Sequence, residues 1–209
     1  MPLSPRFLGL LEAEDLGAMR GLDVGCGRGR LTFWLAERAR HVVGLDRDPA
    51  AIKEARRLAE QAQVGTVDFI EADAEREEYH RFAPDIVTAH LCASDVIIER
   101  ASRALRPGHC LGMVAFHVDQ WKETGKVSRF AYDEARMELS LKAQGLVPEA
   151  LEVEREVKRF SSVEEGLAAA VGLEDAWRAD GRWFHYIAFL EGGGRTLTRA
   201  HLIVKARKS

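Results

Sequence analysis

The residues best suited to chemistry in this sequence form a glycine-rich turn at residues 22–29, Leu-Asp-Val-Gly-Cys-Gly-Arg-Gly. Its three glycines alternate with other residues, directly after an apolar stretch and directly before a helical pattern. A glycine has no Cβ, so a small ligand can lie against its backbone. The helix that follows begins with unpaired N–H groups at the same place. We therefore expect a site for a nucleotide-like ligand at this turn.

Two carboxylates follow later strand-like stretches of the same half of the chain. Asp46, followed by Arg47, ends one apolar stretch, and Asp73, followed by Ala74, comes after another. Open α/β sheets bind ligands where the carboxyl ends of their parallel strands meet, and an acid after the second strand can accept hydrogen bonds from ribose hydroxyls. Asp73 can accept from an adenine amino group, with the Ala74 N–H near a ring nitrogen. The alternative for Asp73 is a solvated position in an acidic run.

Candidate catalytic groups are few. Ala89 and His90 end the fourth predicted strand, where a cofactor and its substrate would meet. His90 is a weak candidate for a general base, which is needed only if the substrate must lose a proton. The alternative is that His90 packs beside the cofactor and contributes mainly its backbone. His117, at the end of the fifth predicted strand, is a second weak candidate. The seven histidines are scattered, and we expect no metal site.

The elements that must position these groups alternate between strand and helix. Strands separated by helices of this length form crossover connections and a mostly parallel sheet covered on both faces. Asp48-Pro49 is typical of a helix start, with Asp as the N-cap. The apolar spacing predicts a leading helix at 3–18, strands at 21–25, 41–46, 66–72, 85–92 and 110–117, and helices at 29–39, after Asp48 and after Ser94 or Asp95.

The pattern changes after residue 118. We expect an irregular polar stretch at 119–130, a helix at 132–144, a strand at 148–160 and a last strand at 196–206 that pairs antiparallel with it. Between these strands, residues 162–191 are predicted to be helical in two pieces, broken near Gly181. The chain is thus predicted to be a single domain, 1–209, with a cofactor-binding half at 20–117 and a substrate-side half at 118–209.

On these residues the chain resembles the class I S-adenosylmethionine-dependent methyltransferases, in the broad small-molecule group that includes the ubiquinone and menaquinone biosynthesis C-methyltransferases. The matching segments are residues 22–29, 42–46 (Val-Val-Gly-Leu-Asp), 71–74 (Glu-Ala-Asp-Ala), 84–87 (Pro-Asp-Ile-Val) and 104–108 (Ala-Leu-Arg-Pro-Gly). The resemblance implies an α/β, Rossmann-like, doubly wound seven-stranded sheet, mostly parallel with an antiparallel last strand. It also implies S-adenosylmethionine as the cofactor and S-adenosylhomocysteine as the product.

Carried over residue by residue, the resemblance assigns cofactor contacts to one set of positions. These are Asp23, Gly25, Cys26, Gly27, Gly29, Asp46, Arg47, Asp73, Ala74, Ala89 and His90. The acceptor of the methyl group is expected to be a small molecule, reached by in-line displacement at the cofactor's methyl group. Its identity is not encoded in the cofactor half.

Two other functions remain open alternatives. A dinucleotide-dependent oxidoreductase would have a glycine at the sixth place of the turn counted from Gly25, but Arg30 stands there. A non-catalytic cofactor-binding module is the second alternative. Methylation of base amino groups is disfavoured, because the end of the fourth strand, 88–94 (Thr-Ala-His-Leu-Cys-Ala-Ser), lacks an Asn-Pro-Pro-Tyr type of motif.

Composition limits partners and location. The net charge is −3 and the pI about 6.2, which gives no electrostatic argument for nucleic acid or an anionic membrane. No apolar run approaches a membrane span, the N-terminus lacks a signal-peptide pattern, and we expect a cytoplasmic protein. Cys26, Cys92 and Cys110 are expected to be reduced. The absence of Asn and the low count of Gln fit a thermophilic source. We expect a monomer or homodimer.

Overall fold

The computed structural model describes residues 3–209, so Met1 and Pro2, part of the N-terminal stretch in which no signal-peptide pattern was predicted, lie outside the described residues. Its strands are β1 (Arg20–Val24), β2 (His41–Asp46), β3 (Val67–Glu71), β4 (Ile86–His90), β5 (Cys110–His117), β6 (Ala131–Tyr132), β7 (Leu146–Arg159) and β8 (Thr196–Lys208).

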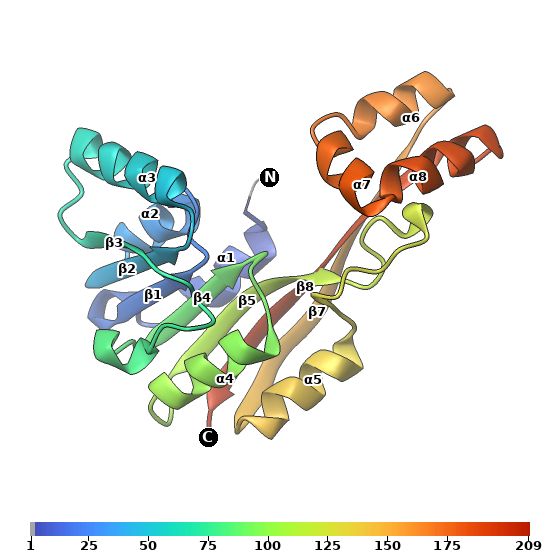
Figure 1. Ribbon diagram of the computed structural model, residues 1–209. Coiled ribbons are helices and arrows are strands. Elements are labelled where there is room, and N and C mark those ends of the chain that lie inside the picture. The colour runs from blue at the N-terminus through green and yellow to red at the C-terminus, as the bar shows by residue number, and fades with distance from the viewer. Residues whose placement is uncertain (1–2) are drawn as a thin grey trace. The chain divides into compact units, whose positions relative to one another are not determined.

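Helices connect these strands (Figure 1). The α-helices are α1 (Pro5–Glu12), α2 (Arg30–Ala36), α3 (Pro49–Ala62), α4 (Asp95–Ala104), α5 (Glu134–Ala143), α6 (Val163–Ala169), α7 (Glu174–Asp180) and α8 (Arg182–Glu191). Short 3-10 helices are η1 (Leu16–Ala18), η2 (Tyr79–Phe82) and η3 (Lys122–Thr124). Within residues 3–209, no helix combines the length and apolarity needed to cross a membrane.

The sheet is doubly wound, as predicted, and its strand order is β3-β2-β1-β4-β5-β8-β7. It has eight strands rather than the predicted seven, because the short β6 pairs with β5 outside that path. Strands β1 to β5 pair in parallel. Their register places Val24 beside both Leu45 and Ala89, and Asp46 beside Glu71. The predicted site residues at the ends of these strands therefore lie along one edge of the sheet, at the carboxyl ends of its parallel strands. The last strand runs antiparallel to β5, because Lys208 at the end of β8 exchanges backbone hydrogen bonds with Gly108 and His109, directly before β5.

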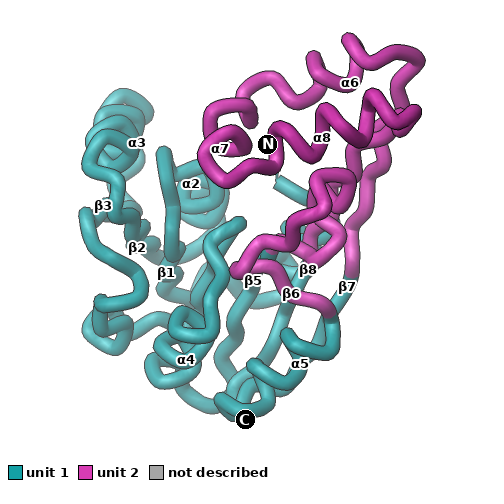
Figure 2. Tube along the Cα trace, turned by 45° about the vertical axis from the view of Figure 1, so that its right-hand side comes forward, with its two compact units in different colours: residues 1–115, 134–152, 203–209 teal, residues 116–133, 153–202 magenta. Residues whose placement is uncertain are grey.

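The chain divides into two compact units (Figure 2). Unit 1 comprises residues 1–115, 134–152 and 203–209, and unit 2 comprises 116–133 and 153–202. Unit 1 contains the parallel sheet, with α1 and α2 packed on it through Phe7, Leu11, Leu31 and Leu35. Unit 2 contains α6, α7 and α8, whose core is largely aromatic and includes Trp177, Trp183 and Tyr186.

A buried ion cluster links the first turn after α1 to the last strand within unit 1. The Glu14 carboxylate, whose side chain is 9% exposed, contacts Lys205 and accepts a hydrogen bond of 2.6 Å from Arg207. Glu149 also accepts from Arg207, at 2.9 Å. These cations hold the pKa of the Glu14 carboxyl below its usual value, and Arg207 is the largest cause. Charges buried this deeply need such partners.

The structure corrects several predicted boundaries. The leading helix ends at Glu12 and resumes only as η1, so one helix over 3–18 was wrong. The region 162–191 contains three helices rather than two. Besides the predicted break at Gly181, there is a second break between α6 and α7, where Gly172 has a φ of +88°. The irregular stretch at 119–130 includes η3 and leads into β6, which was not predicted.

Candidate functional site

The glycine turn between β1 and α2 requires glycine at each of its three positions. Gly25, Gly27 and Gly29 have φ values of +68°, +55° and +86°, in the left-handed region that side chains disfavour. Gly29 ends the turn as the residue before α2, and its carbonyl accepts the N–H of Phe33 at 2.8 Å. The Cys26 N–H donates to the Leu45 carbonyl at 2.9 Å, which joins the turn to the end of β2.

The three glycines face different surroundings. A Cβ on Gly25 would lie 2.5 Å from the Cβ and Sγ of Cys92, and one on Gly29 would lie 2.8 Å from the Phe69 ring. A Cβ on Gly27 would have no heavy atom within 4 Å. Two of the glycines therefore allow other parts of the protein to approach the turn. At Gly27 the backbone faces open space, as a bound ligand needs.

Asp46 is held against this turn at the end of β2. Its Oδ2 accepts the Gly27 N–H at 2.7 Å, and its Oδ1 accepts the Asp48 N–H at 2.9 Å. A carboxylate has about four lone-pair positions, so each oxygen can accept one more hydrogen bond. Two neighbouring hydroxyl groups, such as those of a ribose, could each donate a hydrogen bond to one of these oxygens. Arg47 beside it is exposed.

A cavity of about 490 Å³ adjoins the turn within unit 1. Its lining includes Leu3, Asp23, Gly25, Gly27, Arg28 and His90. Asp46 and Asp73 are not among its lining residues, so their predicted contacts with ribose and adenine stay predictions. The cavity does bring the glycine turn and His90 together, as the sequence predicted for the ends of the first and fourth strands.

Asp23 is the most deeply buried charged group at the turn, with 1% exposure. Its Oδ2 accepts from the Thr32 hydroxyl at 2.7 Å, and its Oδ1 accepts from the Thr88 hydroxyl at 3.0 Å. Burial raises the pKa of Asp23 to about 6, although both hydroxyl hydrogen bonds oppose that shift. The carboxyl ties β1 to α2 and β4 directly beneath the turn, and it thereby fixes the position of the turn.

Asp73 and Ala74 lie in the turn after β3. The Asp73 Oδ1 accepts the Glu75 N–H at 3.0 Å, and its Oδ2 lies 3.5 Å from the Arg76 Nε. The Ala74 carbonyl accepts from the Tyr79 hydroxyl at 2.8 Å. Asp73 thus shapes its own turn, and its side chain is 42% exposed. Each Asp73 oxygen has a further lone pair, so the carboxylate can still accept a hydrogen bond from an adenine amino group.

The end of β4 bends sharply. Ala89 is fully buried, so only its backbone is available to a ligand. Leu91 adopts a φ of +58°, a costly conformation for leucine, and its N–H donates to the Val114 carbonyl at 2.7 Å. This bend ends the strand at His90, two residues before the predicted end, and brings Cys92 against Gly25. Such strain often occurs at functional sites.

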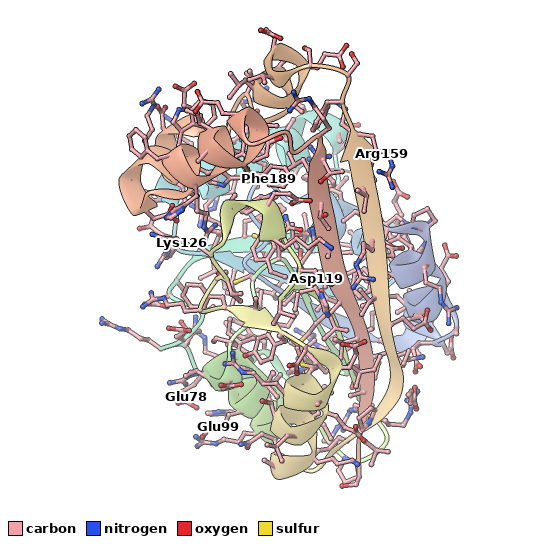
Figure 3. The ribbon with its side chains drawn as sticks, turned by 90° about the vertical axis from the view of Figure 1, so that its right-hand side faces the viewer. Glu78, Glu99, Asp119, Lys126, Arg159 and Phe189 are labelled. Atoms are coloured by element: carbon pink, nitrogen blue, oxygen red, sulfur yellow. The ribbon has the colours of Figure 1, made fainter. Side chains whose placement is uncertain are left out.

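His117 belongs to unit 2 and is 5% exposed. Its Nδ1 accepts the Asp119 N–H at 3.1 Å, so a neutral ring carries its proton on Nε2. The Asp119 carboxylate in turn contacts Arg155; Asp119 is labelled in Figure 3. With its proton on Nε2, His117 suits a hydrogen-bond donor better than a general base.

Several residues at this site were missed by sequence reasoning. Thr32 and Thr88 donate hydrogen bonds to Asp23. Both are polar residues at buried positions, and a buried hydroxyl needs a hydrogen-bond partner, so the sequence could have indicated them. Cys92 and Leu3 had no such signal, because their positions depend on contacts between distant segments. The thiol pKa values of Cys26 and Cys92 are raised by burial, so both are poor nucleophiles.

No group of three or more His, Cys, Asp or Glu side chains among residues 3–209 is arranged to hold a metal ion.

Known proteins resemble this chain in sequence and in fold. Residues 16–162 match the model of a family described as a methyltransferase domain. A ubiquinone biosynthesis O-methyltransferase of Acinetobacter baylyi is 33% identical over 105 residues, which cover 46% of this chain and 43% of that protein. The chain thus matches less than half the length of this curated relative. The relative is an O-methyltransferase, whereas the resemblance in sequence pointed to C-methyltransferases.

Two solved structures share the fold. A SAM-dependent methyltransferase of Methanosarcina mazei superposes with a TM-score of 0.67 at 16% identity, covering 100% of this chain and 99% of that one. The cyclase SpnF superposes with a TM-score of 0.66 at 25% identity, covering 96% of this chain and 80% of that one.

Proposed function

The chain belongs to the methyltransferase domain family, and from that premise we propose that it transfers a methyl group from S-adenosylmethionine to an oxygen atom of a small molecule. The observation that carries the cofactor assignment is the contact between Gly27 and Asp46. It joins the open backbone of the glycine turn to a carboxylate that retains free lone pairs. The O-methyltransferase relative supports oxygen as the receiving atom.

The residues at the turn fit this cofactor. The space over Gly27 accepts backbone contact, and the cavity beside it is lined by Arg28, which can pair with a carboxylate. Asp46 would hold the ribose hydroxyls, while Asp73 and the Ala74 N–H would hold the adenine. When bound, S-adenosylmethionine supplies a methyl group activated by a sulfonium.

This chain's own contribution is positioning. Holding two reactants in line can supply roughly 7–11 kcal/mol of the barrier reduction. That needs no protein nucleophile, which agrees with the high thiol pKa values of Cys26 and Cys92. His90 lines the cavity and is our candidate for accepting a proton from the methyl acceptor.

We further propose that residues 1–209 act as one methyltransferase domain. Residues 20–117 would bind the cofactor, and residues 118–209 would contribute the acceptor side. The acceptor class is a small molecule rather than nucleic acid, and the assembly is a monomer or homodimer. A cytoplasmic location and a thermophilic source remain part of this proposal; a melting temperature in the mesophile range would count against the latter.

The cofactor assignment is tested by calorimetric titration of the protein with S-adenosylmethionine. In a separate unfolding experiment, the cofactor at 100 times its dissociation constant should raise the free energy of unfolding by about 2.7 kcal/mol. Asp46→Ala should weaken binding at least tenfold. Asp68→Ala, which removes an exposed carboxylate from β3, is the matched control and should bind as the wild type does. Absence of any binding by the wild type would refute the proposal.

A second function is favoured by one observation, the shared fold with the cyclase SpnF. The second candidate function is therefore cyclisation of a small molecule, without transfer of a methyl group. The two functions separate in a turnover assay with a panel of phenols and hydroxy acids. Release of S-adenosylhomocysteine supports methyl transfer, whereas cofactor binding with acceptor conversion but no release supports the second function.

A further inference from the structure

A second cavity lies at the amino ends of the parallel strands, at the opposite edge of the sheet from the glycine turn. Its volume is about 630 Å³, and all of its lining residues belong to unit 1. Among them, Arg20 begins β1, Arg40 directly precedes β2 and Asp85 directly precedes β4. None of the lining residues is shared with the cavity beside the glycine turn, so this cavity is a separate place for a ligand.

The lining carries more positive than negative charge. It includes three arginines, Arg20, Arg40 and Arg106, against two aspartates, Asp15 and Asp85. Two histidines also line the cavity and add positive charge when they are protonated. A concave surface lined by an excess of one charge concentrates ions of the opposite sign. The cavity therefore favours an anion.

One of the two aspartates is already engaged within the protein. The Asp85 Oδ2 accepts the Arg20 backbone N–H at 2.9 Å, and its Oδ1 accepts from the Arg106 guanidinium at 2.7 Å. The His109 Nε2 lies 3.4 Å from the same Oδ1. These donors offset the charge of Asp85, so it repels an incoming anion less than a free carboxylate does. Asp85 also fixes the direction of the Arg106 side chain.

The guanidinium groups of Arg20 and Arg40 keep most of their donors. The Arg20 Nε donates to the Phe82 carbonyl at 3.4 Å, and its two terminal nitrogens have no partner among the described residues. No described residue pairs with the Arg40 guanidinium. Backbone hydrogen bonds nevertheless fix where both side chains start: the Arg40 N–H donates to the Met19 carbonyl at 3.0 Å, and the Arg20 carbonyl accepts the Asp85 N–H at 2.8 Å.

The rest of the lining suits the body of an organic molecule. Its apolar part consists of small or flexible side chains: Ala18, Met19, Ala83, Pro84 and Ala104. The second aspartate, Asp15, precedes η1 but does not cap it, and its carboxylate has no partner among the described residues. A carboxylate with open lone pairs accepts hydrogen bonds from hydroxyl groups. The cavity thus combines cations, one acceptor and an apolar wall.

We propose that this cavity binds the phosphate monoester of a small hydroxylated molecule, such as a sugar phosphate. The phosphate would lie on the guanidinium groups of Arg20, Arg40 and Arg106, and a hydroxyl group would donate to Asp15. A guanidinium presents parallel N–H groups that match two phosphate oxygens. The volume of about 630 Å³ falls in the range of small-molecule sites, so a larger ligand than inorganic phosphate fits. This inference does not rest on the proposed methyl transfer.

The test is calorimetric titration of the whole protein with glucose 6-phosphate, with inorganic phosphate and glucose as matched probes. Glucose 6-phosphate should bind most tightly, inorganic phosphate more weakly, and glucose not measurably. Arg40→Gln should weaken binding of glucose 6-phosphate by about fivefold, as expected for one exposed ion pair. Arg57→Gln is the matched control and should bind as the wild type does, because Arg57 lies on α3, pairs with Glu54 and does not line the cavity.

Further variants identify the cavity and the groups of the ligand that it recognises. Asp15→Ala should reduce the preference for glucose 6-phosphate over inorganic phosphate, because that preference depends on a hydroxyl group. Arg28→Gln, beside the glycine turn, should leave binding of glucose 6-phosphate unchanged. Absence of binding, equal affinity for both phosphates, or a loss in Arg28→Gln without one in Arg40→Gln would each overturn the proposal. No S-adenosylmethionine takes part, so failure here leaves the proposed function to its own test.

Discussion

Replacing Asp23 by asparagine should stabilise the protein at neutral pH and remove a pH dependence that the wild type has. Asp23 is 1% exposed and sits between the hydroxyls of Thr32 and Thr88. Asparagine has nearly the same shape and needs no charge in this buried position. Each threonine hydroxyl can rotate to donate or accept, so the pair can satisfy an amide as well as a carboxylate.

The magnitude follows from the pKa. Burial raises the pKa of Asp23 from 3.8 to about 6, and a change of one in pKa corresponds to about 1.4 kcal/mol. Ionised Asp23 therefore costs the folded state about 3 kcal/mol relative to the unfolded state. The stability contributed by the protonated carboxyl is fully present below pH 3.8 and is lost as pH rises to about 6. The Asp23→Asn variant has no such loss, because an amide does not titrate in this range.

Urea unfolding of both proteins at pH 4.5 and pH 7.5 measures this effect. The difference in free energy of unfolding between Asp23→Asn and wild type should grow by about 2 kcal/mol between these pH values, because part of the total is already lost at pH 4.5, which lies above the unfolded pKa of 3.8. Other carboxyls contribute equally to both proteins and cancel. Thr32→Val is the complementary variant: it removes a donor to Asp23 and should destabilise more at pH 7.5 than at pH 4.5. A difference between the asparagine variant and wild type that does not change with pH would refute the reasoning.

Three further outcomes follow from the structure. Glu14→Gln leaves the charge of buried Lys205 poorly compensated and should lower the free energy of unfolding, measured in urea, by about 3 kcal/mol. Because the pKa of Glu14 is lowered in the folded protein, the stability that Glu14 contributes to the wild type should be lost as pH falls below 4.5. Gln63→Gly should raise stability by up to about 1 kcal/mol, because this exposed residue ends α3 at a φ of +54°. Gly29→Ala, which would clash with Phe69, should lower the melting temperature strongly. Gly27→Ala should lower it less, by the strain of its positive φ alone, yet abolish cofactor binding in calorimetry.

Much of the fold was predictable because its signals are local. The bounds of β2 and β5 match the predicted 41–46 and 110–117, and α3 begins at Pro49 after its predicted cap, with the Asp48 side chain accepting the Ala50 N–H. Apolar runs, caps and turns identify such elements from a few neighbouring residues. The parallel order then follows from the strand–helix alternation.

The errors arise where distant segments decide the outcome. The leading helix stops at Glu12, and the buried contacts of Glu14 are to Lys205 and Arg207, almost the whole chain away. Strand β4 stops at His90 and not at the predicted Cys92, because Cys92 packs against Gly25. No local pattern contains either contact, so neither boundary could be read from nearby residues.

The glycine turn shows how far a motif can support a function. Its three glycines look equivalent in sequence, and all three adopt positive φ values. Yet Gly25 makes room for Cys92 and Gly29 makes room for Phe69, while only Gly27 leaves backbone open to a ligand. Most of the motif therefore reflects how β1, α2 and β3 pack with the segment after β4. Under the proposed function, cofactor binding depends on Gly27 and its hydrogen bond to Asp46. A related chain that kept Gly25 and Gly29 but lost Gly27 or Asp46 should keep this fold without its cofactor.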